Sequence, residues 1–245
     1  MARFVLIHGA FGGSWCWQTM TDRLREAGHE ATAIDLPGHG SDTTPLDQVD
    51  LDAYAERVCE VLGQGPPALL AGQSMGGMAI TQAAARCPEH VAALIYVAAF
   101  APQEGQSLID LTQLPEAAGD QVQANLVAEG DPPIATLPVE AAPEVLYQCA
   151  EPDRAAWAAR QLGPQPVAAF TQPLRVDDHA QAFATLPRAC VTCLQDRAIM
   201  PAMQRRMYTA AGCDPVIEID TDHSAWLSRP DELFAALTRI ADELG

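Results

Sequence analysis

The pentapeptide G-Q-S-M-G at residues 72–76 constrains this chain more than any other stretch. It has the form G-x-S-x-G, and it lies between an apolar run at 68–71 and an alanine-rich, helix-favouring segment at 77–87. A serine at so sharp a strand-to-helix turn takes a strained backbone, and the flanking glycines leave room for it. The hydroxyl of Ser74 would then lie at a helix N-terminus, which favours negative charge. We therefore predict that Ser74 is a nucleophile.

The segments around this motif alternate between strand-like and helix-like patterns. Strands are expected at residues 3–7, 31–36, 68–71, 91–98, 189–194 and 216–219. Helices are expected at residues 14–27, with Ser14 as the N-cap, and at 51–62, 77–87, 201–211 and 230–244. Such alternation predicts an α/β fold with a mostly parallel, doubly wound sheet and right-handed crossovers.

Residues 101–185 interrupt this alternation. They contain ten prolines, no convincing strand, and three arginines against twelve acidic residues. An 85-residue loop without structure of its own is uncommon in a compact domain. We therefore expect a cap, or lid, of short helices here, inserted into a core formed by residues 1–100 and 186–245.

Composition excludes several classes of function. The formal net charge is −18, which disfavours binding to nucleic acid or to anionic membranes. All 14 basic residues are arginine, so Schiff-base chemistry, a Ser–Lys dyad and a P-loop lysine are excluded.

No apolar run approaches the length of a membrane span, and no signal peptide is expected. Nothing in the pattern indicates an oligomeric state.

The cysteines do not form a recognisable framework. Seven are scattered along the chain, and the C-x-x-C of Cys190 and Cys193 lies in an apolar, strand-like run without a second pair. Buried thiols and a reducing, cytoplasmic location are expected. Because no cluster has metal-ligand spacing and no G-x-G-x-x-G follows a strand, we expect neither a metal nor a cofactor.

A serine nucleophile needs a general base, and His223 is the best placed of the six histidines. It follows the last expected strand, and loops at the carboxyl ends of parallel strands share one edge of the sheet with Ser74. Asp196, which follows the strand ending at residue 194, is expected to orient His223. Asp220 and Asp222 are rivals, although their closeness in sequence hinders either side chain from turning onto His223.

Acyl transfer also needs donors directed at the developing oxyanion. One is the backbone N–H of Met75, directly after the nucleophile. The second is expected in the loop after the first strand, from the N–H of Ala10, with Phe11 as the neighbouring alternative. Gly9, Phe11 and His39 are expected to line the substrate pocket.

Several short motifs along the chain form a recognisable set. They are F-V-L-I-H-G-A at 4–10, W-x-W at 15–17, G-H at 28–29, D-L at 35–36, G-x-D at 40–42, G-Q-S-M-G-G at 72–77, D-R-x-I-x-P at 196–201 and D-H-S-x-x-L-S-x-P at 222–230. With these motifs the chain resembles the plant methylesterase and hydroxynitrile lyase family of α/β-hydrolases. The resemblance covers both core halves and fades in residues 101–185. The loop P-G-H-G at 37–40 departs from the plant pattern and is typical of bacterial hydrolases.

The resemblance implies the α/β-hydrolase fold, a helical cap, no cofactor and a Ser74–His223–Asp196 triad with oxyanion donors at Ala10 and Met75. We predict a serine carboxylesterase that acts on a neutral, moderately hydrophobic small-molecule ester. A lyase on the same triad and a ligand-binding receptor are the alternatives. The family's lyases carry a threonine where this chain has Gly9 and a lysine where it has Ser224, which favours the esterase.

Overall fold

The computed structural model describes residues 1–176 and 179–245. Six parallel strands form one sheet in the order β2-β1-β3-β4-β8-β9. They are β1 (Arg3–Ile7), β2 (Glu30–Ile34), β3 (Ala68–Ser74), β4 (Val91–Ala99), β8 (Arg188–Cys193) and β9 (Val216–Ile219). β3 and β4 are buried along nearly their whole length, as central strands covered on both faces must be. The α/β prediction is confirmed.

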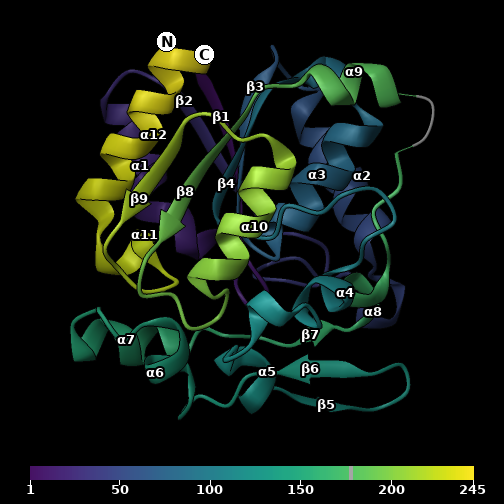
Figure 1. Ribbon diagram of the computed structural model, residues 1–245, viewed down its shortest axis with the longest axis vertical. Helices are drawn as coiled ribbons and strands as arrows, with labels where there is room; N and C mark the ends of the chain where they lie inside the picture. Colours follow the sequence, from purple (N-terminus) through teal and green to yellow (C-terminus); the bar gives the residue numbers. More distant parts are fainter. Residues whose placement is uncertain (177–178) are drawn as a thin grey trace.

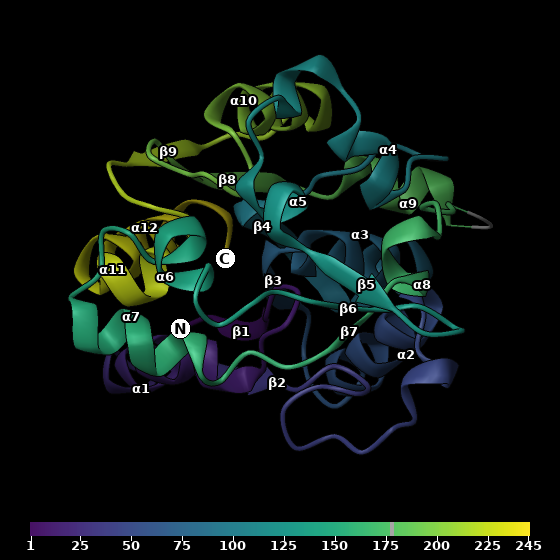
Figure 2. The same ribbon diagram turned by 90° about the horizontal axis from the view of Figure 1, so that it is seen from below.

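Helices cover both faces of the sheet (Figure 2). On one face α1 (Gln18–Glu26) packs against the closing helix α12 (Pro230–Leu244), with α11 (Ala225–Ser228) beside it. On the other face lie α2 (Leu51–Leu62), α3 (Gly76–Arg86) and α10 (Pro201–Ala211). Three short 3-10 helices complete the core: η1 (Ser14–Trp17), η2 (Leu46–Gln48) and η3 (Pro88–His90).

Residues 101–185, called the insertion below, lie between β4 and β8 in sequence. Their helices are α4 (Leu108–Thr112), η4 (Pro115–Ala117), α5 (Gln121–Asn125), α6 (Ala142–Leu146), α7 (Pro152–Ala159), α8 (Ala168–Thr171) and α9 (Ala180–Thr185). The insertion also contains β5 (Val127–Glu129), β6 (Ile134–Thr136) and β7 (Gln165–Pro166), which form a small antiparallel sheet. We expected residues 101–185 to contain short helices and no strands, and this expectation was wrong. The three strands are too short to give a recognisable sequence pattern.

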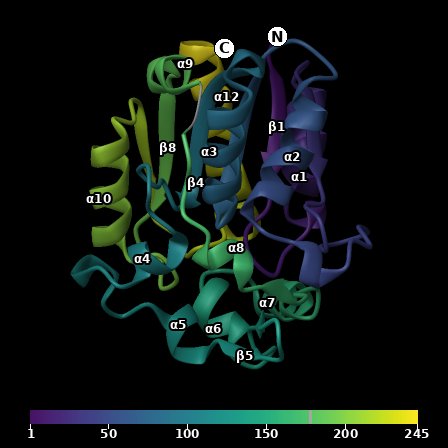
Figure 3. The same ribbon diagram turned by 90° about the vertical axis from the view of Figure 1, so that its right-hand side faces the viewer.

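Much of the insertion lies at one end of the sheet. In Figure 1 the β8 arrow points downward, and α5, α6, α7 and the small sheet lie below it. Figure 3 shows the same elements beneath the core from the side. The carboxyl ends of the parallel strands, and the loops that follow them, therefore face the insertion.

The start of the first helical segment differs from the prediction. Residues Ser14–Trp17 form a 3-10 turn before α1, and the Ser14 side chain caps no backbone N–H. Instead, the Ser14 backbone N–H donates to Asp35 Oδ1 at 2.6 Å. The carboxylate at the end of β2 therefore holds this turn in place of a serine cap.

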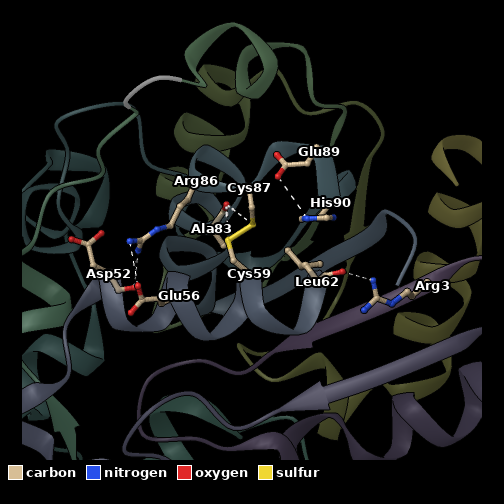
Figure 4. The surroundings of a disulfide bond; sticks show 10 residues. All are labelled: Arg3, Asp52, Glu56, Cys59, Leu62, Ala83, Arg86, Cys87, Glu89 and His90. Carbon is tan, nitrogen blue, oxygen red and sulfur yellow. Dashed lines mark hydrogen bonds and ion pairs between the residues drawn. A yellow bond between two sulfur atoms is a disulfide. The ribbon is translucent and has the colours of Figure 1, made fainter. Parts of the chain in front are cut away.

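A disulfide joins Cys59 of α2 to Cys87 at the end of α3 (Figure 4). This pairing is not apparent from the sequence, because the two residues lie 28 positions apart in separate helical segments. Cys190 and Cys193 are buried free thiols, as predicted. No helix in the described residues is long and apolar enough to cross a membrane.

Candidate active site

Ser74 ends β3 with a positive backbone φ of 55°, which non-glycine residues adopt only under strain. The glycines around it are required by close approach. A Cβ atom at Gly72 would lie 2.6 Å from the Gly76 carbonyl oxygen, and one at Gly76 would lie 2.6 Å from the His8 carbonyl oxygen. The chain therefore makes the sharp strand-to-helix turn that the motif predicts.

The strand register brings the loop after β1 beside this turn. Ile7 pairs with Gly72, so the residues that follow β1 continue alongside the residues that lead to Ser74. A Cβ on Gly9 would lie 2.7 Å from Ser74 Cβ. Ala10 and Met75 both line the cavity in front of Ser74, and their N–H groups donate to no other described residue. Two unpaired backbone donors are thus available at the position expected for an oxyanion hole.

His223 and Asp196 meet across the ends of β8 and β9. His223 Nδ1 lies 2.8 Å from Asp196 Oδ2, and both side chains are buried. A carboxylate oxygen accepts, so Nδ1 is the donor, and in the neutral imidazole Nε2 keeps its lone pair. Ser74 and His223 line the same cavity, and Ser74 Oγ forms no hydrogen bond to the residues described.

The Asp196 carboxylate is held from several directions. Its Oδ1 accepts from the backbone N–H groups of Ala198 and Ile199, at 2.8 and 2.9 Å. Its Oδ2 accepts from Gln204 Nε2 at 2.9 Å in addition to His223. The geometry of the charged acceptor is therefore fixed before any substrate binds.

The rival aspartates bind other groups. Asp222 Oδ2 accepts from the Cys149 N–H at 2.7 Å and from Ser228 Oγ at 2.8 Å. Asp220 Oδ1 accepts from Gln195 Nε2 at 2.9 Å. Among the described contacts of His223, Asp196 is the one carboxylate hydrogen-bonded to its ring.

A cavity of about 330 Å³ lies between these groups and the insertion. Gly9 and Phe11, two of the residues predicted for the substrate pocket, line it together with Ser74 and His223. Most of its remaining wall is apolar, including Phe100, Leu108, Leu146, Leu162, Phe170 and Trp226. Small apolar molecules fit such a space.

The electrostatic surroundings of His223 favour its protonated form. Burial alone would lower its pKa, but the Asp196 carboxylate beside Nδ1 and the more distant Asp222 and Asp120 outweigh burial. The net effect is a pKa raised above the ordinary value for histidine. An imidazolium formed during catalysis would therefore be stabilised.

His39 was predicted to line the substrate pocket, and the structure places it elsewhere. Its ring packs on that of His8 at 5.1 Å between centroids, and its Nε2 lies 2.7 Å from Tyr54 Oη. Burial, followed by the nearby His8, lowers the pKa of His39 to about 3. The loop after β2 reaches the correct edge of the sheet but turns behind the 9–13 loop, where His39 lines a separate cavity with Asp35.

Four further residues at the site were not predicted. Gln204 of α10 binds Asp196, and Gln73 Nε2 donates to the His223 carbonyl oxygen at 3.3 Å. Tyr147 and Asp120, both from the insertion, line the cavity. Only Gln73 had a usable signal, because it precedes the nucleophile within the G-x-S-x-G motif.

The insertion is joined to each of the three catalytic loops through a backbone N–H. Gly163 N donates to the Phe11 carbonyl at 2.8 Å, beside the candidate oxyanion hole. Gln121 N donates to the Arg197 carbonyl at 2.8 Å, next to Asp196. Cys149 N donates to Asp222, the neighbour of His223, at 2.7 Å. These three hydrogen bonds help to position the insertion relative to the loops that carry Phe11, Asp196 and His223.

The described residues offer little support for a metal site or for a cysteine nucleophile. Within residues 1–176 and 179–245, no group of three or more His, Cys, Asp or Glu side chains could hold a metal ion. Cys16 lines the cavity, but burial raises the pKa of its thiol to about 12. A thiol with that pKa is protonated at neutral pH and is a poor nucleophile.

Comparison with known proteins identifies a family for this chain. The model of the family described as Alpha/beta hydrolase family matches residues 4–237. The chain belongs to the alpha/beta hydrolase family. This alpha/beta hydrolase is 31% identical to Methylesterase 7 of Arabidopsis thaliana over 257 residues, covering 98% of this chain and 96% of the relative.

A second relative connects sequence with structure. Polyneuridine aldehyde esterase of Rauvolfia serpentina is 28% identical to this alpha/beta hydrolase over 257 residues, with 98% of this chain and 95% of the relative covered. A crystal structure of polyneuridine aldehyde esterase matches it with a TM-score of 0.87 at 25% identity, covering 99% and 100% of the two chains. The predicted resemblance to the plant methylesterases is confirmed.

Proposed function

We propose that this alpha/beta hydrolase is a serine carboxylesterase that cleaves a neutral, moderately hydrophobic small-molecule ester through a covalent acyl-enzyme. The observation that carries the proposal is the strained Ser74 facing a cavity shared with the buried His223–Asp196 pair. The names of the relatives, methylesterases and an esterase, support ester hydrolysis. We also propose that residues 101–185 act as the cap over a core of residues 1–100 and 186–245.

The proposed reaction begins when Ser74 Oγ attacks the ester carbonyl carbon and its proton passes to His223 Nε2. The carbonyl oxygen becomes an oxyanion that accepts hydrogen bonds from the Ala10 and Met75 N–H groups. The bond to the alcohol oxygen then breaks, and the alcohol leaves with the proton held by His223. Water repeats the sequence on the acyl-enzyme and releases the acid, while Asp196 stays ionised.

Acyl-enzyme formation can be tested with p-nitrophenyl acetate. Rapid mixing should give a burst of p-nitrophenol equal to the enzyme concentration, and Ser74→Ala should lose both the burst and turnover by a factor of about 10⁴ or more. The unfolding transition of the variant serves as the control for folding. A folded Ser74→Ala protein with near-normal turnover would refute the proposal, and binding without any turnover in the unmutated protein would indicate a receptor.

Lyase activity is the alternative on the same triad, and the geometry at Gly9 argues against it. Any Cβ at this position would come within 2.7 Å of Ser74 Cβ, so the threonine of the family's lyases has no room here. Ser224 supplies no positive charge for a departing cyanide, and the chain contains no lysine. Incubation with mandelonitrile and with p-nitrophenyl acetate at one pH separates the two activities, because a lyase would release cyanide without cleaving the ester.

A cytoplasmic location remains our proposal from the cysteine pattern. The Cys59–Cys87 disulfide weighs against it, because structural disulfides are rare in a reducing cytoplasm. Thiol titration of the denatured protein from its native cells distinguishes a reducing compartment from an oxidising one. Seven reactive thiols would fit a reducing compartment, and five would fit an oxidising one.

A further inference from the structure

Asp120 is a charged group in the cavity that the proposed reaction does not use. Among the described residues lining this cavity it is the one carboxylate, and none of them is arginine or lysine. Arg197, which is close in sequence to the catalytic Asp196, is paired with Glu144. Within this cavity wall, His223 is therefore the one basic side chain near the negative charge of Asp120, and no arginine or lysine neutralises it.

Two contacts fix the position of Asp120. Its Oδ1 caps α5 by accepting from the Val122 and Gln123 N–H groups, at 2.8 and 3.1 Å. The next residue, Gln121, donates its N–H to the Arg197 carbonyl, so the start of α5 is tied to the loop that carries Asp196. Asp120 consequently lies on the catalytic side of the insertion, within electrostatic reach of His223.

The second carboxylate oxygen of Asp120, Oδ2, can accept further hydrogen bonds. Oδ2 accepts only from Gln123 Nε2, at 3.2 Å, among the described residues, and the Gln123 side chain is itself exposed. A half-buried carboxylate with a free lone pair attracts a positive charge more strongly than it would in water. The aromatic rings of Phe170 and Trp226 on the same cavity wall are compatible with a cation.

We propose that Asp120 determines specificity by selecting esters that carry an ammonium group over esters of the same shape without charge. This inference rests on the proposed esterase function and departs from the proposed substrate in charge: the body of the ester is still apolar, but one end is positively charged instead of neutral. Anionic esters are excluded by the same carboxylate.

The test compares pairs of substrates that differ only in charge. Acetylcholine and 3,3-dimethylbutyl acetate differ by one positive charge in the alcohol. Glycine betaine ethyl ester and ethyl 3,3-dimethylbutyrate differ by one positive charge in the acyl group. For each pair, the ratio of kcat/KM values is measured at pH 8 in the unmutated protein and in Asp120→Asn. Intrinsic differences in ester reactivity cancel when the two proteins are compared.

Asparagine keeps the oxygen that caps α5 and removes only the charge. We expect Asp120→Asn to lower the charged-to-neutral ratio by about tenfold for at least one pair. Asp120→Ser, which also retains a capping oxygen, should lower it similarly. Asp110→Asn is the matched control, because Asp110 is an exposed residue in the N-terminal capping box of α4 and does not line the cavity.

A pH profile gives a readout that a purely structural role would not change. Three carboxylates raise the pKa of His223: Asp196, Asp222 and Asp120. Removing the charge of Asp120 should therefore move the acid limb of kcat/KM to lower pH. Unchanged charge ratios for both pairs in Asp120→Asn would overturn the inference and leave the esterase proposal intact. Failure of the unmutated protein to cleave any ester, including p-nitrophenyl acetate, would overturn both.

Discussion

Asp196 and Asp222 lie in neighbouring loops beside His223, yet their carboxylates have different partners. The Asp196 carboxylate accepts a hydrogen bond from His223 Nδ1. The Asp222 carboxylate accepts from the backbone N–H of Cys149 and from the hydroxyl of Ser228. The two aspartates should therefore differ in their contribution to catalysis, although both are buried.

We expect Asp196→Asn to reduce kcat by about 10⁴, because an amide beside Nδ1 favours the wrong tautomer of the base. Asp222→Asn should reduce it by less than about tenfold, since an amide oxygen can still accept from Cys149 or Ser228. The measurement is kcat for p-nitrophenyl acetate in both variants. The reverse ranking would assign the acid of the triad to Asp222.

The pH dependence of activity should report His223. As a base it must be neutral, and the net effect of its carboxylate neighbours raises its pKa, so the acid limb of kcat/KM should lie above the ordinary value of about 6.5. His8 and His39 are not expected to contribute, because burial lowers the pKa of both. An acid limb well below pH 6 would contradict this account of the site.

At the scale of elements, the disulfide between α2 and α3 offers a test of stability. It closes a loop with a sequence separation of 28 residues, and a crosslink of that size contributes about 3 to 4 kcal/mol to the free energy of unfolding. Changing Cys59 and Cys87 to serine together should lower the urea midpoint accordingly. Reduction of the unmutated protein should have the same effect, and an unchanged midpoint in both experiments would mean that the crosslink contributes nothing.

Much of the core was predictable because buried parallel strands and amphipathic helices have clear periodic patterns. The strands of the small sheet escaped prediction because β5 and β6 have three residues each, β7 has two, and β5 is exposed. The Ser14 cap was wrong because a carboxylate distant in sequence, Asp35, provides the acceptor.

The structure brings together the predicted site residues that lie at strand ends. Ser74 ends β3, and Asp196 and His223 follow β8 and β9, so topology alone brings them to one edge of the sheet. His39 also follows a strand, but its loop packs behind the site. Asp120 reaches the cavity from a five-residue helix of the insertion, whose location no sequence pattern specifies.

For the molecule as a whole, we expect activity to be independent of metals. The sequence has no cluster with metal-ligand spacing, and the described residues contain no group of three or more potential ligands. Ester hydrolysis should be unchanged after dialysis against EDTA and require no added cofactor. Loss of activity on chelation, restored by a divalent metal, would contradict the serine mechanism.

Three of the hydrogen bonds that join the insertion to the loops of the candidate site come from main-chain N–H groups, at Gln121, Cys149 and Gly163. A main-chain donor is supplied by every amino acid except proline. Substitutions in the insertion can therefore exchange cavity-lining side chains and leave these attachments in place. The main-chain attachments of the insertion to the core can therefore stay constant. The side chains that line the cavity can vary, and with them the chemical character of the cavity wall. Proteins built on this plan can acquire new substrates through a few substitutions without rebuilding the catalytic machinery.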